Sequence, residues 1–190
     1  MSIEPHPKFA EIKRELESFA KRGKSFSAVC FRCTAQQYAS QVVTGLGSQR
    51  EGGRWNPKGL FPTVYLCETP ETALKEFLAR GRRMRIPDHL ALPMTMAGVE
   101  VFVANLLDLT DADVSAVVNP LMTAETQHWR ELQNRREAVS QAIGRAVKEI
   151  CFGGLIAASH ASPVERIIVV FPGKIGIHDR LVALGPLSTI

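Results

Sequence analysis

The chain has 190 residues with 45% hydrophobic and 22% charged content, a composition that excludes disordered and collagen-like classes and predicts one domain able to bury a core without disulfides or metal ions. Its formal net charge of +4 permits anionic ligands but is too small to indicate nucleic-acid binding by itself. Because no apolar run approaches the roughly 20 residues of a membrane helix and the polar N-terminus shows no signal peptide, we expect a cytoplasmic protein outside the membrane.

The predicted elements alternate irregularly between helices and strands. Apolar residues recur at helical spacing near the N-terminus, β-branched and aromatic runs mark short strands, and Thr69-Pro70-Glu71 is typical of a helix start. In chain order we expect a helix over 8–21, strands over 26–33 and 63–67, a helix over 69–79, a strand over 98–106, a short helix from 110, a long helical region over 125–150 broken near 135, and strands over 155–158 and 166–171. This order predicts a mixed α+β domain and not a regular βαβ alternation.

A long connection over residues 34–62 separates the first two predicted strands, with a short helix expected near 36–43. It contains the sequence EGGRWNPKG at positions 51–59, where Arg54 and Trp55, one of only two tryptophans, directly follow two glycines. Glycines let a backbone approach a ligand closely, and loops of this length in compact domains are usually functional. The connection is therefore a candidate binding element.

Four cysteines offer a possible metal or redox site. Cys30 and Cys33 form a C-x-x-C pair, but both lie in a predicted strand, where residues three apart point to opposite faces. No second C-x-x-C and no nearby histidine pair completes a zinc set. We expect structural, reduced thiols.

Four polar side chains lie where predicted strands, helices and loops meet, and each also has an ordinary structural explanation. Arg32 in the first strand either extends its head group to solvent or is buried against an anion. Arg54 either grips a pyrophosphate or carboxylate or is a surface arginine after a turn. Tyr65 is central to a strand, where core packing is the ordinary role, and Glu76 has Arg80 at i+4, which suits a solvated ion pair.

The motifs of several enzyme classes are absent. The sequence contains no G-x-S-x-G, P-loop, H-E-x-x-H or strand-linked G-x-G-x-x-G motif. The densest basic run, at Arg80, Arg82, Arg83 and Arg85, has no interleaved aromatic residue, which favours a solvated helix end over a phosphate-binding patch.

Two long stretches of the sequence resemble a known family. Residues 45–77, GLGSQREGGRWNPKGLFPTVYLCETPETALKEF, together with the preceding FRC at 31–33, look like the start of a RES domain, a toxin family named for its arginine, glutamate and serine. Residues 142–162, AIGRAVKEICFGGLIAASHAS, resemble the late segment of that domain. The resemblance thus covers about residues 31–171 and implies a RES domain over 25–190, preceded by an N-terminal helical extension over 1–24.

The resemblance also implies which residues form the site. Arg32 and Glu76 match the family arginine and glutamate, and Ser159 matches the serine, with Ser162 as the alternative because Ala158 stands where the family usually has proline. Two further positions match residues that would bind the substrate. They are Arg54, the arginine of the glycine motif, and Tyr65, the aromatic residue before the glutamate helix.

The function implied by the resemblance is the toxin half of a toxin–antitoxin pair. Such a protein has a fold like that of ADP-ribosyltransferases, a central mixed sheet flanked by helices, and cleaves NAD+ at the nicotinamide–ribose bond by hydrolysis or phosphorolysis. NAD+ is the substrate, with no metal and no further cofactor, and its depletion arrests growth. The implied partner is an Xre-like antitoxin that inserts into the cleft, and a homodimer involving the N-terminal helix stays open.

These residue types suit that chemistry. Breaking the bond places positive charge on the ribose, which a carboxylate such as Glu76 stabilises. Arg32 and Arg54 suit the pyrophosphate, and Tyr65 and Trp55 suit stacking on nicotinamide or flanking it. Two alternatives remain open: transfer of ADP-ribose to a protein target, and a non-enzymatic nucleic-acid-binding module that uses the basic run at 80–85.

Overall fold

The computed structural model describes residues 3–83, 85–122, 128–162 and 164–189. Its strands are β1 (Lys24–Ala35), β2 (Val64–Cys67), β3 (Met94–Asp108), β4 (Gly154–Ala158), β5 (Arg166–Val170) and β6 (Arg180–Thr189). They form one six-stranded sheet in the order β1-β2-β5-β4-β3-β6, and β1 also pairs with β3, which closes five of the strands into a ring. The β3–β4 pair is parallel and the other pairs are antiparallel. The sheet is therefore mixed, as predicted.

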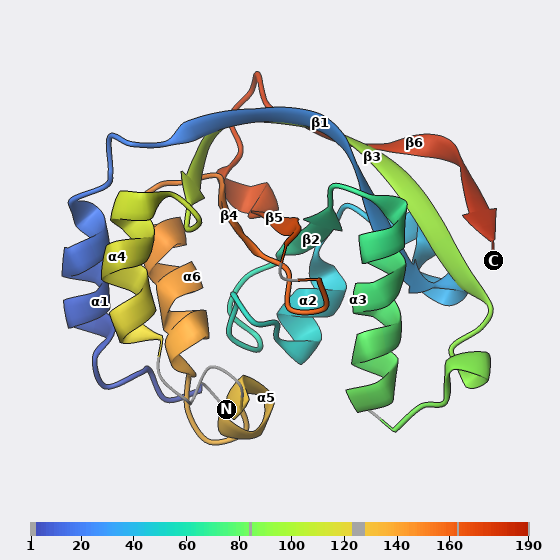
Figure 1. Cartoon of the computed structure of the whole chain (residues 1–190), viewed down its shortest axis with the longest axis horizontal. Coiled ribbons are helices and arrows are strands. Elements are labelled where there is room, and N and C mark those ends of the chain that lie inside the picture. Colours follow the sequence, from blue (N-terminus) through green and yellow to red (C-terminus); the bar gives the residue numbers. More distant parts are fainter. Residues whose placement is uncertain (1–2, 84, 123–127, 163, 190) are drawn as a thin grey trace.

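Helices cover this sheet in two groups (Figure 1). The α-helices are α1 (Phe9–Glu17), α2 (Leu46–Glu51), α3 (Pro70–Arg83), α4 (Ala112–Leu121), α5 (Trp129–Leu132) and α6 (Val139–Glu149). Short 3-10 helices are η1 (Gln36–Gln41), η2 (Asp88–Leu90) and η4 (Pro172–Lys174). In Figure 1, α1, α4 and α6 stand together on the left, α3 stands on the right, and the loop from β4 to β5 comes down between them. None of the described helices is long and apolar enough to span a membrane.

The N-terminal helix belongs to the left-hand helical group. Ile12 and Leu16 on α1 are buried, and α1 packs against α6 and α4. The segment before α1 is tied to the start of α6, since the backbone N–H of His6 donates to Glu137 (3.0 Å). Glu137 is itself buried and accepts two hydrogen bonds from Arg145 (2.8 and 2.7 Å). The predicted extension thus shares a core with the rest of the chain.

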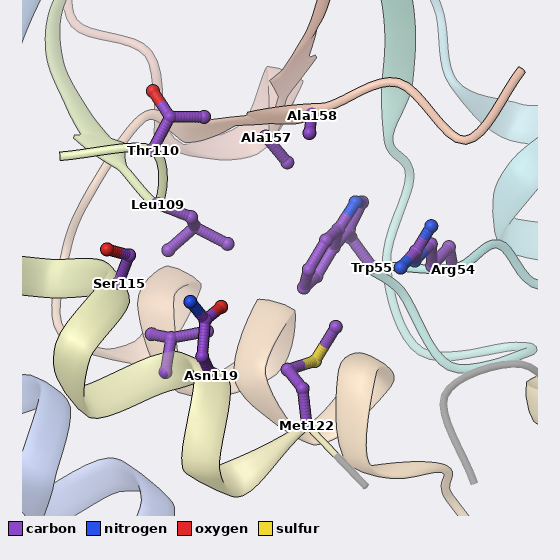
Figure 2. A pocket seen from close by; sticks show the side chains of 10 residues that line it. Arg54, Trp55, Leu109, Thr110, Ser115, Asn119, Met122, Ala157 and Ala158 are labelled. Carbon is purple, nitrogen blue, oxygen red and sulfur yellow. The ribbon is translucent and has the colours of Figure 1, made fainter. Parts of the chain in front are cut away.

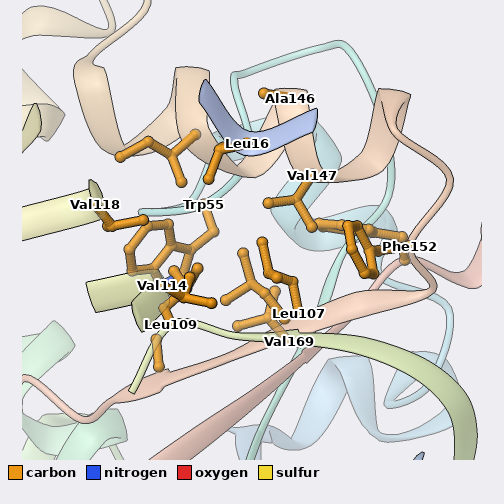
Figure 3. Close-up of a cluster of buried hydrophobic side chains, with 14 of the residues drawn as sticks. Leu16, Trp55, Leu107, Leu109, Val114, Val118, Ala146, Val147, Phe152 and Val169 are labelled. Carbon is orange, nitrogen blue, oxygen red and sulfur yellow. The ribbon is translucent and has the colours of Figure 1, made fainter. Parts of the chain in front are cut away.

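Two hydrophobic clusters lie on opposite faces of β1. Cys30 is buried in the cluster enclosed by the ring of strands, whereas Cys33 packs against the cluster beneath the helices. The predicted divergence of the two cysteines is therefore confirmed, and all four cysteines are free thiols. Figure 3 shows the second cluster, where Trp55 lies among side chains of α4, α6 and the sheet. Burial raises the pKa of the Cys30 thiol to about 12.

Two predicted helix starts are found in the structure, one of them shifted by one residue. Thr69 caps α3 as predicted, accepting from the backbone N–H of Thr72 (3.2 Å). For α4 the capping side chain is Asp111, which accepts from Asp113 N (3.1 Å), one residue later than the start expected at Thr110. A charge-assisted bond at this end suits the exposed N–H groups of a first turn.

The turn between β3 and α4 is held by a buried carboxylate. Asp108 is buried and accepts hydrogen bonds from the backbone N–H and hydroxyl of Thr110 (2.9 and 2.5 Å) and from Lys24 Nζ (3.2 Å). Burial opposes ionisation, but these bonds outweigh it and hold the pKa of Asp108 below its ordinary value. The turn therefore depends on an ionised Asp108.

Several predicted boundaries were wrong. Strands β1 and β3 are longer than expected, because each pairs along most of the other, and β6 was not predicted at all. The helical region expected over 125–150 is broken near residue 135, as predicted, but its described helices, α5 of 4 residues and α6 of 11, are shorter than expected, and residues 125–127 lie outside the described residues. The longest of the described helices is α3, with 14 residues, which continues to Arg83 and not only to residue 79.

Candidate active site

The carboxylate of Glu76 on α3 is held by the loop that follows β4. Its Oε1 accepts three hydrogen bonds, from Ser159 Oγ (2.6 Å) and from the backbone N–H groups of His160 and Ala161 (both 3.1 Å). No hydrogen bond between described residues engages the other oxygen, Oε2. One carboxylate oxygen is thus fixed by three hydrogen bonds, whereas the second has none from the described residues.

The hydroxyl of Ser159 is fully used within this arrangement. Ser159 is 3% exposed, and its Oγ donates to Glu76 and accepts from the backbone N–H of Ser162 (3.1 Å). Its own backbone N–H donates to the carbonyl of Glu165 (2.8 Å). The geometry makes Ser159 a group that orients Glu76, whereas Ser162 contributes its backbone.

Two further contacts tie the β4–β5 loop to the N-terminal end of α3. The carboxylate of Glu165 accepts from the hydroxyls of Thr69 (3.0 Å) and Thr72. Arg166 binds Glu68 through two hydrogen bonds (2.9 and 2.5 Å). The loop that carries Ser159 is therefore attached to α3 at both ends, which fixes the position of Glu76 relative to the end of β4.

Three arginines lie close enough to Tyr65 to influence the pKa of its hydroxyl. Arg32 on β1 is half-buried and donates from Nη1 to the carbonyl of Val42 (3.0 Å), and burial together with the charge of Arg80 lowers the pKa of Arg32 to about 10. Burial raises the pKa of Tyr65, while the positive charges of Arg32, Arg54 and Arg130 oppose that rise. Several cations near one side chain suit a ligand with more than one negative charge.

Gly52 and Gly53 in the 51–59 loop have close contacts inside the protein. A side chain at Gly53 would collide with the hydroxyl of Tyr65 (2.3 Å), and Gly52 has a φ of +75° and faces Gln133. The Tyr65 hydroxyl accepts from the backbone N–H of Trp55 (2.9 Å) and donates to Asn56 Oδ1 (2.7 Å). The loop is thus fastened to β2 through Tyr65.

Trp55 is mainly a core residue. It is 3% exposed, and its carbonyl lies so close to α6 that a side chain at Gly144 would meet it at 1.9 Å. The guanidinium carbon of Arg54 lies 5.5 Å from the centre of the Trp55 ring, within range of a cation–π contact. Close packing of the loop on α6 therefore fixes both side chains.

A pocket of about 330 Å³ lies between α4, the 51–59 loop and the end of β4 (Figure 2). Ala157 and Ala158, the two residues before Ser159, form part of its wall. The remaining lining residues come from the loop, from the β3–α4 turn and from α4 with the residue after it: Arg54, Trp55, Leu109, Thr110, Ser115, Val118, Asn119 and Met122. The pocket thus adjoins the segment that holds Glu76.

The structure brings the predicted site residues together in two groups. Glu76 and Ser159 are hydrogen-bonded across 83 positions of sequence, and Arg32 and Arg54 both act on Tyr65. The sequence did not indicate the backbone donors of residues 160 and 161, the proximity of Arg130 to Tyr65, or the contribution of α4 to a pocket.

In the basic run at 80–85, Arg82 forms an ion pair with Asp88 on η2 (3.0 and 2.6 Å).

Comparisons with known proteins agree with this fold. The model of the RES domain family matches residues 29–184. Curated relatives named NAD(+) phosphorylase MbcT, from Mycobacterium bovis and Mycobacterium tuberculosis, are 29% identical over 90 residues, which is 47% of this chain and 46% of each relative. The chain therefore spans about half the length of the curated relatives it matches.

A solved structure resembles nearly the whole chain. The crystal structure of the M. tuberculosis MbcT–MbcA toxin–antitoxin complex matches with a TM-score of 0.71 at 18% identity, over 94% of this chain and 93% of that chain. At this identity the likeness concerns the fold, and it confirms the predicted single α+β domain with helices flanking a mixed sheet.

Proposed function

The chain belongs to the RES domain family, and from that premise we propose that it is an enzyme that cleaves NAD+ at the nicotinamide–ribose bond. The observation that carries the proposal is the carboxylate of Glu76, whose Oε1 is held by three donors while Oε2 has no hydrogen bond from the described residues. A fixed negative charge suits a reaction that develops positive charge on a sugar.

In the proposed reaction the bond between the ribose anomeric carbon and the nicotinamide nitrogen breaks, and its electron pair neutralises the pyridinium. The anomeric carbon becomes oxocarbenium-like, and Glu76 stabilises it through Oε2. The oxygen of water or of inorganic phosphate then attacks that carbon, giving ADP-ribose or its 1″-phosphate, and the attacking water or acidic phosphate loses a proton to solvent. Ser159 acts indirectly, because its buried hydroxyl orients Glu76.

The arginines serve to hold the substrate. Arg32 and Arg54 both lie close enough to Tyr65 to influence its pKa, and their two guanidinium groups would bind the two phosphates of NAD+. Arg80, which lies close enough to Arg32 to lower its pKa, adds to the same positive field. The Tyr65 hydroxyl is hydrogen-bonded to Trp55 and Asn56 of the 51–59 loop, so its role is to position that loop beside the substrate.

The biological role that follows is that of a toxin. The curated relatives are named NAD(+) phosphorylase, and the similar solved structure is a toxin–antitoxin complex. We infer that this chain depletes NAD+ in the cytoplasm, arrests growth, and is neutralised by an Xre-like antitoxin protein that covers the site. Phosphorolysis is favoured over hydrolysis as the reaction, since the relatives carry that name.

The test is to incubate the purified chain with NAD+, with and without phosphate, and to follow nicotinamide release. Release with formation of ADP-ribose 1″-phosphate or ADP-ribose supports the proposal. NAD+ labelled in the adenine ring separates the alternative, because transfer to a protein would give a labelled protein band while the bulk NAD+ stays intact. No nicotinamide release in either buffer would refute NAD+ cleavage.

A further inference from the structure

The pocket between α4, the 51–59 loop and the end of β4 contains a buried hydrogen-bond donor that has no acceptor among the described residues. Trp55 is 3% exposed, and its Nε1–H has no hydrogen-bond partner among the described residues. Figure 2 shows the indole at the wall of the pocket, with its nitrogen at the end of the ring nearer Ala158. Leaving a buried N–H unsatisfied costs about 1–3 kcal/mol, so this donor points to an acceptor that a ligand supplies.

The rest of the lining defines the shape of that ligand. Leu109, Val118 and Ala157 are buried and apolar, and Met122 closes the same side of the pocket. The polar lining side chains are Arg54, Thr110, Ser115 and Asn119. Ser115 on α4 already donates to the carbonyl of Ala112 (3.0 Å). A small pocket with a buried apolar wall and a few polar groups suits a planar aromatic ring that carries a polar substituent.

The position of the pocket identifies which ring this is. Ala157 and Ala158 directly precede Ser159, which binds Glu76. In NAD+ the nicotinamide is bonded to the ribose carbon at which cleavage occurs, whereas the adenine is separated from it by two riboses and the pyrophosphate. A ring bound next to Ser159 is therefore the nicotinamide, and its carboxamide oxygen is a hydrogen-bond acceptor.

We propose that the pocket between α4 and β4 binds the nicotinamide of the substrate and that the Trp55 Nε1–H donates to its carboxamide oxygen. Trp55 is then a specificity-determining residue that selects a pyridine bearing a carbonyl group. This inference rests on the proposed function, since it takes NAD+ as the substrate. It assigns to Trp55 a hydrogen bond in place of ring stacking, because the faces of its indole are buried in the core.

The first test needs no turnover. The chain has only two tryptophans, Trp55 and Trp129, so a proton–nitrogen NMR spectrum contains two indole N–H signals, and Trp129→Phe identifies the signal of Trp55. Adding nicotinamide to the wild-type protein should shift the Trp55 signal downfield and leave that of Trp129 in place. Pyridine, which lacks the carboxamide, should produce less than half of that shift at the same occupancy. An unmoved Trp55 signal at saturating nicotinamide, or equal shifts with both probes, would overturn the proposal.

The second test uses Trp55→Phe, which keeps an aromatic ring in the core and removes the N–H. The KM for NAD+ should rise roughly tenfold, the loss expected for one hydrogen bond. For an NAD+ analogue whose base is unsubstituted pyridine, the same variant should change KM by less than twofold. Equal losses with both substrates would mean that the N–H does not contact the carboxamide. If the wild type binds nicotinamide but releases none from NAD+, the proposed reaction fails while the pocket assignment stands.

Discussion

Replacing Glu76 by glutamine separates the two tasks that the structure gives to this side chain. Oε1 accepts three hydrogen bonds from the β4–β5 loop, and a glutamine retains a carbonyl oxygen for them. Each bond then loses the benefit of a charged acceptor, an effect reduced by the partial exposure of Glu76, so Glu76→Gln should lower the free energy of unfolding by about 1 kcal/mol in all. Glu76→Ala leaves all three donors without an acceptor and should cost about 2–3 kcal/mol.

The catalytic cost should be much larger than the cost in stability. Removing one electrostatic stabiliser of a transition state slows enzymes by roughly 100- to 1,000-fold, or about 2.7–4 kcal/mol. Glu76→Gln should therefore lower kcat for nicotinamide release by that factor with KM changed less than threefold, while denaturant unfolding still shows a folded protein. Glu71→Gln is the matched control, because it removes the same charge from the exposed first turn of the same helix and should leave kcat unchanged. A folded Glu76→Gln protein with kcat within threefold of wild type would refute the assignment.

Three further predictions concern the surrounding residues. Ser159→Ala removes one of three donors to Glu76 and should lower kcat about tenfold with little change in KM. Ser162→Ala keeps the backbone N–H, so its kcat should stay within twofold of wild type. Equal effects of the two variants in steady-state assays would contradict the assigned roles. Arg32→Ala should raise KM for NAD+ at least tenfold, with partial recovery in Arg32→Lys, because Arg32 binds the pyrophosphate. Calorimetric titration with NAD+ checks this prediction, and an unchanged affinity would exclude Arg32 as a pyrophosphate ligand. Asp108→Asn should destabilise the fold above about pH 4. The difference in unfolding free energy between wild type and variant should vanish as the pH falls through the lowered pKa of Asp108, because only the ionised carboxylate stabilises the folded form. A difference that does not depend on pH would contradict this.

The sequence predicted elements better than it predicted contacts. Pro70 after a threonine marked the start of α3, and apolar runs marked the centres of all the strands except β6. The full lengths of β1 and β3 depend on their pairing with each other, which no local pattern records. Strand β6 contains glycine and proline at 185 and 186, residues that weaken a local strand signal, and it forms because β3 offers an edge.

Glu76 shows why the site was only partly visible in the sequence. Its position on α3 and the arginine four residues later are typical of a solvated ion pair. The donors that instead hold it come from residues 159–161. Two of them are backbone N–H groups, which every residue except proline has, so the sequence does not reveal them. The glycine at 144 was a usable signal, since a glycine within a helix often permits close approach, here by the carbonyl of Trp55.

The most direct measurement is a crystal structure of the Glu76→Gln protein with uncleaved NAD+. The proposed function predicts that the anomeric carbon of the nicotinamide ribose lies within about 3.5 Å of the free side-chain atom at position 76, with the pyrophosphate on Arg32 and Arg54. NAD+ bound with that carbon far from position 76, or with the pyrophosphate away from both arginines, would contradict it.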